Sequence, residues 1–157
     1  MRRTLLAAVL ILSAPLLAAD APPPVAAEVE KGVKAYNAHD IVYYEGALST
    51  DAVYIAEDGA VFAGKERVLR VFSRIFAMTP ARQLAVTDLA GGTRGDVAWA
   101  RFKWTLTAGP DSRHGVSSIL FVRAADAWQV LQIQNTPAGH VMAASPAPAS
   151  PSPSPRP

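Results

Sequence analysis

The chain has 157 residues, half of them apolar, with fifteen Lys and Arg, thirteen Asp and Glu, and no cysteine. This length suits a single domain with a substantial hydrophobic core. The absence of cysteine excludes disulfides, thiol catalysis and cysteine-ligated metals. Because Arg2 and Arg3 lie in a predicted leader, the remaining chain is close to neutral. A neutral protein lacks the basic surface typical of nucleic-acid binding, so no nucleic-acid partner is expected.

The N-terminal segment has the pattern of a secretory signal peptide. A basic start, MRR, precedes the apolar run TLLAAVLILSAPLLAA, and small residues follow. Its length and flanks favour a cleaved leader over a membrane span. We predict a signal peptide at 1–19 and a linker at 20–24, and a periplasmic or secreted protein with no membrane span after leader removal. The alternative is an uncleaved N-terminal anchor.

The C-terminal segment, residues 141–157, is rich in Pro, Ala and Ser and carries almost no charge. Such a composition cannot bury enough apolar surface to offset the entropy lost on ordering. We predict a disordered tail, either simply solvated or bound to a partner, and a folded domain at 25–140.

Two helices are predicted at the start of the domain. The first spans 25–38, because apolar side chains recur there at helical spacing, at Val25, Val29, Val33 and Tyr36. Asp40 is a good N-cap for a second, short helix. One face of that helix is expected to carry Ile41, Tyr44, Glu45 and Leu48.

The segment DAVYIAEDGAVFAG predicts two short strands joined by a turn. Asp58 followed by Gly59 is a typical hairpin signal, and an Asp in such a turn accepts hydrogen bonds from its own backbone. Alternatively, Glu57 or Asp58 lies at the rim of a site and takes a proton from a ligand. A third helix begins after Gly64 and ends before Pro80.

The sequence pattern of the remainder of the domain predicts strands. RQLAVTDLA leads into a Gly-rich turn, GGTRGD, and three long strands then form an antiparallel meander: VAWARFKWTLT, VSSILFVR and WQVLQIQN. Strict alternation in the first of these puts Phe102 and Trp104 on one face and Trp99 and Arg101 on the other. Helices followed by strands indicate an α+β fold with the helices on one sheet face.

The order of these segments and their local sequences resemble the SnoaL-like branch of the nuclear transport factor 2-like superfamily, which includes ketosteroid isomerase. The similar segments are YNAHDIVYYEGALSTDAVYIAEDGAVFAGKERVLRVF and FVRAADAWQVLQIQN, and the resemblance covers about residues 25–137. It implies a cone-shaped, strongly curved, mostly antiparallel sheet wrapped around three N-terminal helices, with a pocket between them. The superfamily includes isomerases, polyketide cyclases, dehydratases and non-enzymatic proteins, so the fold does not determine the function.

The resemblance also allows one mechanism to be tested on the sequence. Ketosteroid isomerase uses an Asp base, with a Tyr and a protonated Asp as hydrogen-bond donors. The position matching the Tyr is Gly32, the position matching the base is Ala56, and the second Asp falls near Ser118 or Ile119. All three functional groups are missing, which argues against steroid isomerisation by that route.

On a cone of this kind, the concave face would have an aromatic and apolar lining with a few polar groups. The expected ligand-binding residues are Tyr36, Tyr54, Phe102, Trp104, Ile119, Leu131 and Asn135. This lining suits a small apolar or aromatic ligand. The alternative is that these side chains fill the cone as core.

Glu45 and Asp58 are the catalytic candidates. A carboxylate on the apolar face of the second helix, as expected for Glu45, would have a raised pKa and could act as a general acid or base. Alternatively it reaches water at the edge of that face. The three histidines do not cluster, and there is no nucleotide-binding motif. We therefore expect no metal and no cofactor, and any chemistry would be proton transfer in isomerisation, dehydration or cyclisation.

The outer sheet face is expected to carry Trp99, Arg101, Lys103 and Arg123, which we interpret as a homodimer patch. The leading functional hypothesis is a secreted domain that binds, and could transform, a small apolar molecule in its cone. The competing hypothesis is a non-catalytic, dimeric interaction module.

Overall fold

The computed structural model describes residues 24–139, and the predicted signal peptide and C-terminal tail lie outside them. The elements follow in the order α1 (Pro24–Asn37), α2 (Ile41–Ala47), β1 (Leu48–Ile55), β2 (Val61–Ala63), α3 (Lys65–Phe76), β3 (Arg82–Arg94), β4 (Val97–Ala108), β5 (Asp111–Ala124) and β6 (Ala127–Pro137). Helix α1 begins at a proline, which has no N–H to leave unpaired in the first turn. No helix among these elements has the length and apolar character needed to cross a bilayer.

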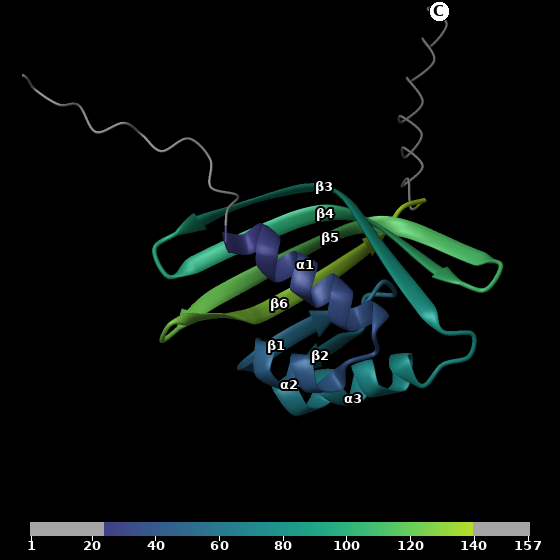
Figure 1. Cartoon of the computed structure of the whole chain (residues 1–157), viewed down its shortest axis with the longest axis horizontal. Helices are drawn as coiled ribbons and strands as arrows, with labels where there is room; N and C mark the ends of the chain where they lie inside the picture. The colour runs from purple at the N-terminus through teal and green to yellow at the C-terminus, as the bar shows by residue number, and fades with distance from the viewer. Residues whose placement is uncertain (1–23, 140–157) are drawn as a thin grey trace, which may run out of the picture.

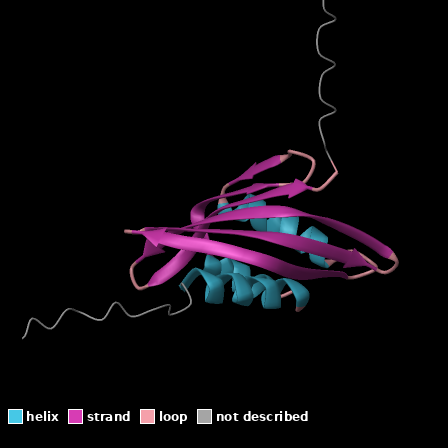
Figure 2. Ribbon diagram, turned by 90° about the horizontal axis from the view of Figure 1, so that it is seen from above, coloured by secondary structure: helices cyan, strands magenta, loops and turns pink. Residues whose placement is uncertain are grey.

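The six strands form one curved sheet in the order β2-β1-β6-β5-β4-β3. Neighbouring strands are antiparallel except β1 and β6, which are parallel. Helix α1 lies across β3 to β6, and α2 and α3 lie beside β1 and β2 (Figure 1). Viewed from above, the strands curve around the helices (Figure 2). The predicted α+β cone is therefore confirmed.

Strand β3 continues through most of the Gly-rich segment that was predicted as a turn. Gly91 pairs with Ala100, and the chain reverses only at Gly95 and Asp96. A Cβ on Gly91 would lie 2.6 Å from the Trp99 carbonyl oxygen and 3.2 Å from Val25 Cγ1. The glycine thus serves the close approach of α1 to the sheet.

The hydrophobic core has two parts. One lies between α1 and β3 to β5 and centres on Ala98, Ala100 and Phe102. The other joins α2, α3 and β1, where Val68 and Phe72 of α3 are almost fully buried. The inward and outward faces of β4 alternate as predicted. The space between the two parts of the core is where a cavity opens.

The β1–β2 connection is the turn predicted from Asp-Gly. The Ala56 N–H donates to the Ala60 carbonyl at 2.9 Å, and the Ala60 N–H donates to Asp58 Oδ1 at 3.0 Å. Gly59 has φ of 84°, a conformation that other residues rarely adopt. Asp58 therefore has a structural role in this turn.

Candidate functional site: the cone cavity

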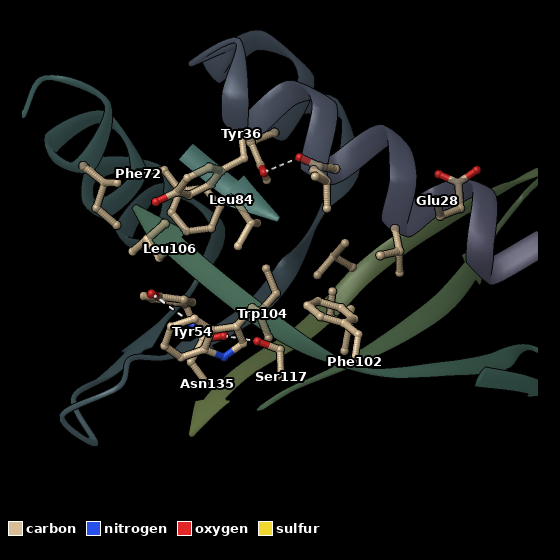
Figure 3. Close-up of a pocket in the computed structure, with 18 of the residues that line it drawn as sticks. Glu28, Tyr36, Tyr54, Phe72, Leu84, Phe102, Trp104, Leu106, Ser117 and Asn135 are labelled. Atoms are coloured by element: carbon tan, nitrogen blue, oxygen red, sulfur yellow. Dashed lines mark hydrogen bonds between the residues drawn. The ribbon is translucent and has the colours of Figure 1, made fainter. Parts of the chain in front are cut away.

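A cavity lies between α1, α2, α3 and the concave sheet face. Its volume is about 120 Å³, and it is partly open to solvent. In Figure 3, Tyr36 and Phe72 lie above this space, and Tyr54, Trp104 and Asn135 lie below it. The lining is mainly aromatic and aliphatic, and includes Val29, Val33, Tyr36, Tyr44, Tyr54, Phe72, Ile75, Leu84, Phe102, Trp104, Leu106, Ile119, Phe121, Val130 and Ile133. Concave, mostly apolar spaces with a few polar groups are typical of small-molecule sites.

Edge-to-face aromatic contacts fix the helix side of the cavity. The Phe72 ring meets the Tyr44 ring at 4.6 Å between centroids and the Tyr54 ring at 5.4 Å, with interplanar angles of 80° and 76°. Tyr36 meets Phe76 in the same way at 5.5 Å. Such pairs are worth about 0.5–1.5 kcal/mol beyond area burial. They connect α1, α2 and α3 to β1.

Three side chains from three strands form a hydrogen-bonded chain across the sheet. Ser117 and Asn135 lie directly opposite each other on β5 and β6. The Ser117 hydroxyl donates to Asn135 Oδ1, and Asn135 Nδ2 donates to the Tyr54 hydroxyl at 3.2 Å (Figure 3). Since the Tyr54 oxygen accepts this bond, its own proton is left to donate to a group in the cavity. We call these three residues the Ser117–Asn135–Tyr54 relay.

Tyr36 and Tyr54 are held in the neutral, donating form. Burial raises the pKa of Tyr54 to about 12, against the opposing effects of the Asn135 hydrogen bond and the Arg82 charge. Burial also raises the pKa of Tyr36, again opposed by the Arg82 charge. At physiological pH each phenol is therefore an O–H donor.

The hydroxyl of Tyr44, although its ring lines the cavity, is already used. It donates to the Gly32 carbonyl at 2.9 Å, and burial raises the pKa of Tyr44 strongly. Gly32 is the position that matches the donor tyrosine of ketosteroid isomerase. The structure thus places a tyrosine beside that position, with its donor committed to the backbone.

Trp104 forms part of the floor of the cavity, and its indole N–H is buried beneath that surface. It is 4% exposed, and its Nε1–H has no hydrogen-bond partner within residues 24–139. Buried N–H groups are rarely left unpaired, because each lost hydrogen bond costs about 1–3 kcal/mol. The indole packs over Gly115 of β5, where a Cβ would lie 2.4 Å from Trp104 Cζ2. The cavity therefore presents the hydroxyl donors of Tyr36 and Tyr54 to an acceptor on a ligand.

One end of the cavity opens into a depression, which we call the mouth. It is lined by Tyr54, Ala56, Glu57, Asp58, Ala60, Phe62, Val71, Ile75, Arg82 and Arg113. Glu57 lines both the mouth and the cavity, and its carboxylate pairs with the Arg113 guanidinium at 2.9 Å. Arg82 also lines both spaces and is half-buried. The charged groups of the site are thus concentrated here.

Asn37 fixes the position of the start of β3, at the mouth, relative to the end of α1. Its Oδ1 accepts from the Leu84 N–H at 2.7 Å, and its Nδ2 donates to the Leu84 carbonyl at 2.9 Å. The side-chain amide therefore pairs with β3 as a neighbouring strand would. This contact ties Tyr36, at the end of α1, to Arg82, at the start of β3.

Six of the seven expected ligand-binding residues line this cavity: Tyr36, Tyr54, Phe102, Trp104, Ile119 and Asn135. The seventh, Leu131, does not. Leu120 pairs with Gln132 whereas Phe121 pairs with Val130, so a β-bulge lies at Leu131. The bulge shifts the alternation of β6 and brings Val130 to the cavity in its place.

The predicted placement of Glu45 is wrong. Glu45 is exposed, whereas its neighbour Tyr44 is 7% exposed and occupies the buried face of α2. Successive helical residues point about 100° apart, so the burial of Tyr44 turns Glu45 outward. The predicted face also extended to Leu48, which belongs to β1.

Asp58 lies at the rim, as expected, but it is exposed and bonded within its turn. The carboxylates that do line the cavity are Glu57 and Glu28, and Glu28 pairs with Lys31 at 2.7 Å. Sequence reasoning also missed Ser117, although alternation along β5 with Ile119 and Phe121 could have indicated it. Among residues 24–139, no three His, Asp or Glu side chains group as metal ligands would.

The outer face of the sheet carries apolar side chains in addition to charges. Trp99 lies opposite Leu120, and both are substantially exposed. Arg123, which was expected on this face, instead pairs in register with Trp128, which packs against the core. Its guanidinium lies 4.6 Å from the Trp128 ring centroid. The β-bulge at Leu131 separates the segment of β6 that contains Trp128 from the rest of that strand.

The chain belongs to the SnoaL-like domain family, whose sequence profile matches residues 25–138. This match confirms the resemblance carried by the helix and hairpin segments. Members of the surrounding superfamily include isomerases and dehydratases, so membership leaves the activity open. Comparison with curated proteins finds no significant match.

Solved structures with this fold have diverse roles. A provisionally assigned dehydratase of the nuclear transport factor 2-like family from Streptomyces avermitilis has 21% identity and a TM-score of 0.66, over 72% of this chain and 92% of its own. A provisionally assigned aromatic ring hydroxylase from Novosphingobium aromaticivorans has 19% identity and a TM-score of 0.63, over 73% and 87%. A provisionally assigned calcium/calmodulin-dependent protein kinase type II association domain from Thiobacillus denitrificans has 20% identity and a TM-score of 0.66, over 75% and 97%. At these identities the similarity establishes the fold alone.

Proposed function

We propose that this protein, secreted or periplasmic once its leader is removed, binds a small apolar or aromatic molecule that carries a hydrogen-bond acceptor. The observation that carries the proposal is the Ser117–Asn135–Tyr54 relay, which holds the Tyr54 hydroxyl at the wall of an apolar cavity and leaves its proton free to donate. A core that merely filled the cone would not need a buried serine hydrogen-bonded to a half-buried asparagine beside the cavity.

A binding cycle tests this proposal. The probes are 2-acetylnaphthalene, which has a carbonyl acceptor, and 2-ethylnaphthalene, which has the same shape without one. We expect wild-type protein to bind both, and the Tyr54→Phe variant to lose about fivefold in affinity for the ketone only, the value of one neutral hydrogen bond. Calorimetric titration measures both affinities. Equal losses for the two probes, or binding of neither, would contradict the proposal.

The acid–base part of the proposal rests on Glu57. A base that removes a proton next to a carbonyl must lie near the donor that stabilises the resulting enolate. Glu57 and Tyr54 line the same cavity and the same mouth. This arrangement supports cofactor-independent isomerisation, dehydration or cyclisation, with Glu57 as the proton acceptor and Tyr54 as the hydrogen-bond donor.

Hydrogen–deuterium exchange at the methyl group of 2-acetylnaphthalene separates an enzyme from a binding protein. We expect the protein to accelerate loss of the methyl proton signal in D₂O. The Glu57→Gln variant should lose this acceleration, and Asp58→Asn should keep it. Binding without any acceleration would identify the site as a binding site only.

A dimeric interaction module is the second candidate, favoured by Trp99 and Leu120 on the outer sheet face, which are 46% and 37% exposed. Apolar side chains grouped on an exposed face are typical of association surfaces. Sedimentation velocity tests this role. We expect Trp99→Lys to convert a dimer to a monomer, and Thr105→Lys, at another exposed position of β4, to leave it dimeric. A wild-type monomer would reject this candidate.

A further inference from the structure

We infer that the ligand of the cone carries a small monoanionic group, such as a carboxylate, which binds Arg82 at the mouth beside the hydroxyls of Tyr36 and Tyr54. This inference rests on the proposed function and narrows the class of ligand. It starts from the location of Arg82, the first residue of β3, which lines both the cavity and the mouth.

Arg82 differs from the other arginines of residues 24–139. Each of the others is exposed to solvent, and two of them, Arg113 and Arg123, also have acidic partners. Arg82 is half-buried, and no carboxylate in that part of the chain lies within ion-pair distance of it. A partly desolvated cation without a counter-charge is unfavourable unless an anion joins it.

The acidic residues of the mouth are already engaged. Glu57 pairs with Arg113 at 2.9 Å, and Asp58 Oδ1 accepts from the Ala60 N–H. The guanidinium of Arg82 therefore has no such partner in the mouth. An anion placed there would meet a guanidinium that has no ion-pair partner within residues 24–139.

The groups around Arg82 are donors as well. Tyr36 and Tyr54 line the same cavity as Arg82. The Tyr54 oxygen already accepts from Asn135, so its proton faces outward from the relay. Arginine and phenol donors together match the several lone pairs of a carboxylate. A single free arginine suits one negative charge, and the apolar lining beyond it suits the hydrocarbon part of the same molecule.

A matched pair of probes tests the inference: 2-naphthoate and its uncharged isostere 2-naphthamide, titrated calorimetrically at neutral pH. We expect wild-type protein to bind the carboxylate about tenfold more tightly than the amide, as a charge-assisted hydrogen bond allows. Arg82→Gln should abolish this preference and leave amide affinity nearly unchanged. Arg101→Gln removes the same charge from the exposed face of β4 and should leave the preference intact.

A salt series keeps the test decisive if Arg82→Gln fails to fold. The preference of wild-type protein for the carboxylate should shrink as ionic strength rises, and Arg82→Lys should retain part of it. Equal binding of the two probes, or a preference that survives Arg82→Gln, overturns the inference and leaves the proposed function standing. Binding of neither probe overturns both.

Discussion

The Gly115→Ala substitution should disturb the floor of the cavity through Trp104. A Cβ at this position would lie 2.2 Å from the Thr136 carbonyl oxygen and 2.4 Å from Trp104 Cζ2. Ordinary heavy-atom contacts are about 3.5–4.0 Å. Neither neighbour yields easily, because one is strand backbone and the other belongs to a ring that is 4% exposed. Relief requires β5 and β6 to separate or the indole to move into the cavity.

The expected cost combines two effects. Overpacking of a well-packed core costs about 1–3 kcal/mol, and a weakened β5–β6 hydrogen bond adds about 1 kcal/mol. Replacing glycine in a strand returns about 0.5–1 kcal/mol of backbone entropy. We therefore expect the free energy of unfolding to fall by about 1–3 kcal/mol in total. Affinity for 2-acetylnaphthalene should fall as well, because the indole would occupy cavity space.

Urea unfolding followed by circular dichroism measures the stability change. Gly46→Ala is the matched control, because Gly46 lies in α2 and a Cβ there meets nothing within 4 Å. That control should gain about 0.5–1 kcal/mol from the better helix propensity of alanine. A Gly115→Ala protein with wild-type stability and wild-type ketone affinity would refute the described packing of Trp104.

Three further outcomes are expected. Stability should fall as pH rises from about 10 towards 12, because the pKa of Tyr54 is about 12 in the folded protein and near 10 in the unfolded chain. The stabilisation is fully present below the unfolded pKa and is lost as pH rises through the folded pKa. Urea titrations at pH 10 and pH 12 should show a loss of about 2 kcal/mol from this group in wild-type protein, and that part of the pH dependence should be absent in Tyr54→Phe. Asn37→Ala should reduce the free energy of unfolding by about 2 kcal/mol, since both backbone groups of Leu84 lose a partner; wild-type stability would contradict this. Glu45→Gln should change neither stability nor ketone affinity by more than about 0.5 kcal/mol, since Glu45 is exposed, and a larger loss would restore it as a candidate.

Local patterns were enough to predict the positions that depend on regular alternation. Tyr54 on β1 and the pair Phe102 and Trp104 on β4 follow the two-residue period of a strand, and all three line the cavity. Leu131 fails because the bulge beside it depends on how β5 and β6 pair. One inserted residue exchanges the faces of a strand, and nothing in WQVLQIQN marks where the insertion falls.

The polar relay could not be predicted for a related reason. Asn135 and Tyr54 are 81 positions apart, and they meet only because β1 pairs in parallel with β6. Glu57 and Asp58 were predicted either as turn residues or as a proton acceptor at the rim, and the turn accounts for Asp58. Glu57 instead pairs with Arg113, which lies 56 positions later in the chain. This contact depends on the folded arrangement of the mouth and could not be predicted from local sequence.

The position of a bound probe within the chain tests the central claim most directly. The indole N–H resonances of Trp104, in the cavity, and Trp99, on the outer sheet face, can be followed by NMR while 2-acetylnaphthalene is added. We predict a saturable shift of the Trp104 resonance, because a bound aromatic probe would lie against the indole that lines the cavity, with the Trp99 resonance unchanged. A saturable shift confined to Trp99, or no saturable shift of either resonance, would contradict a ligand site in the cone.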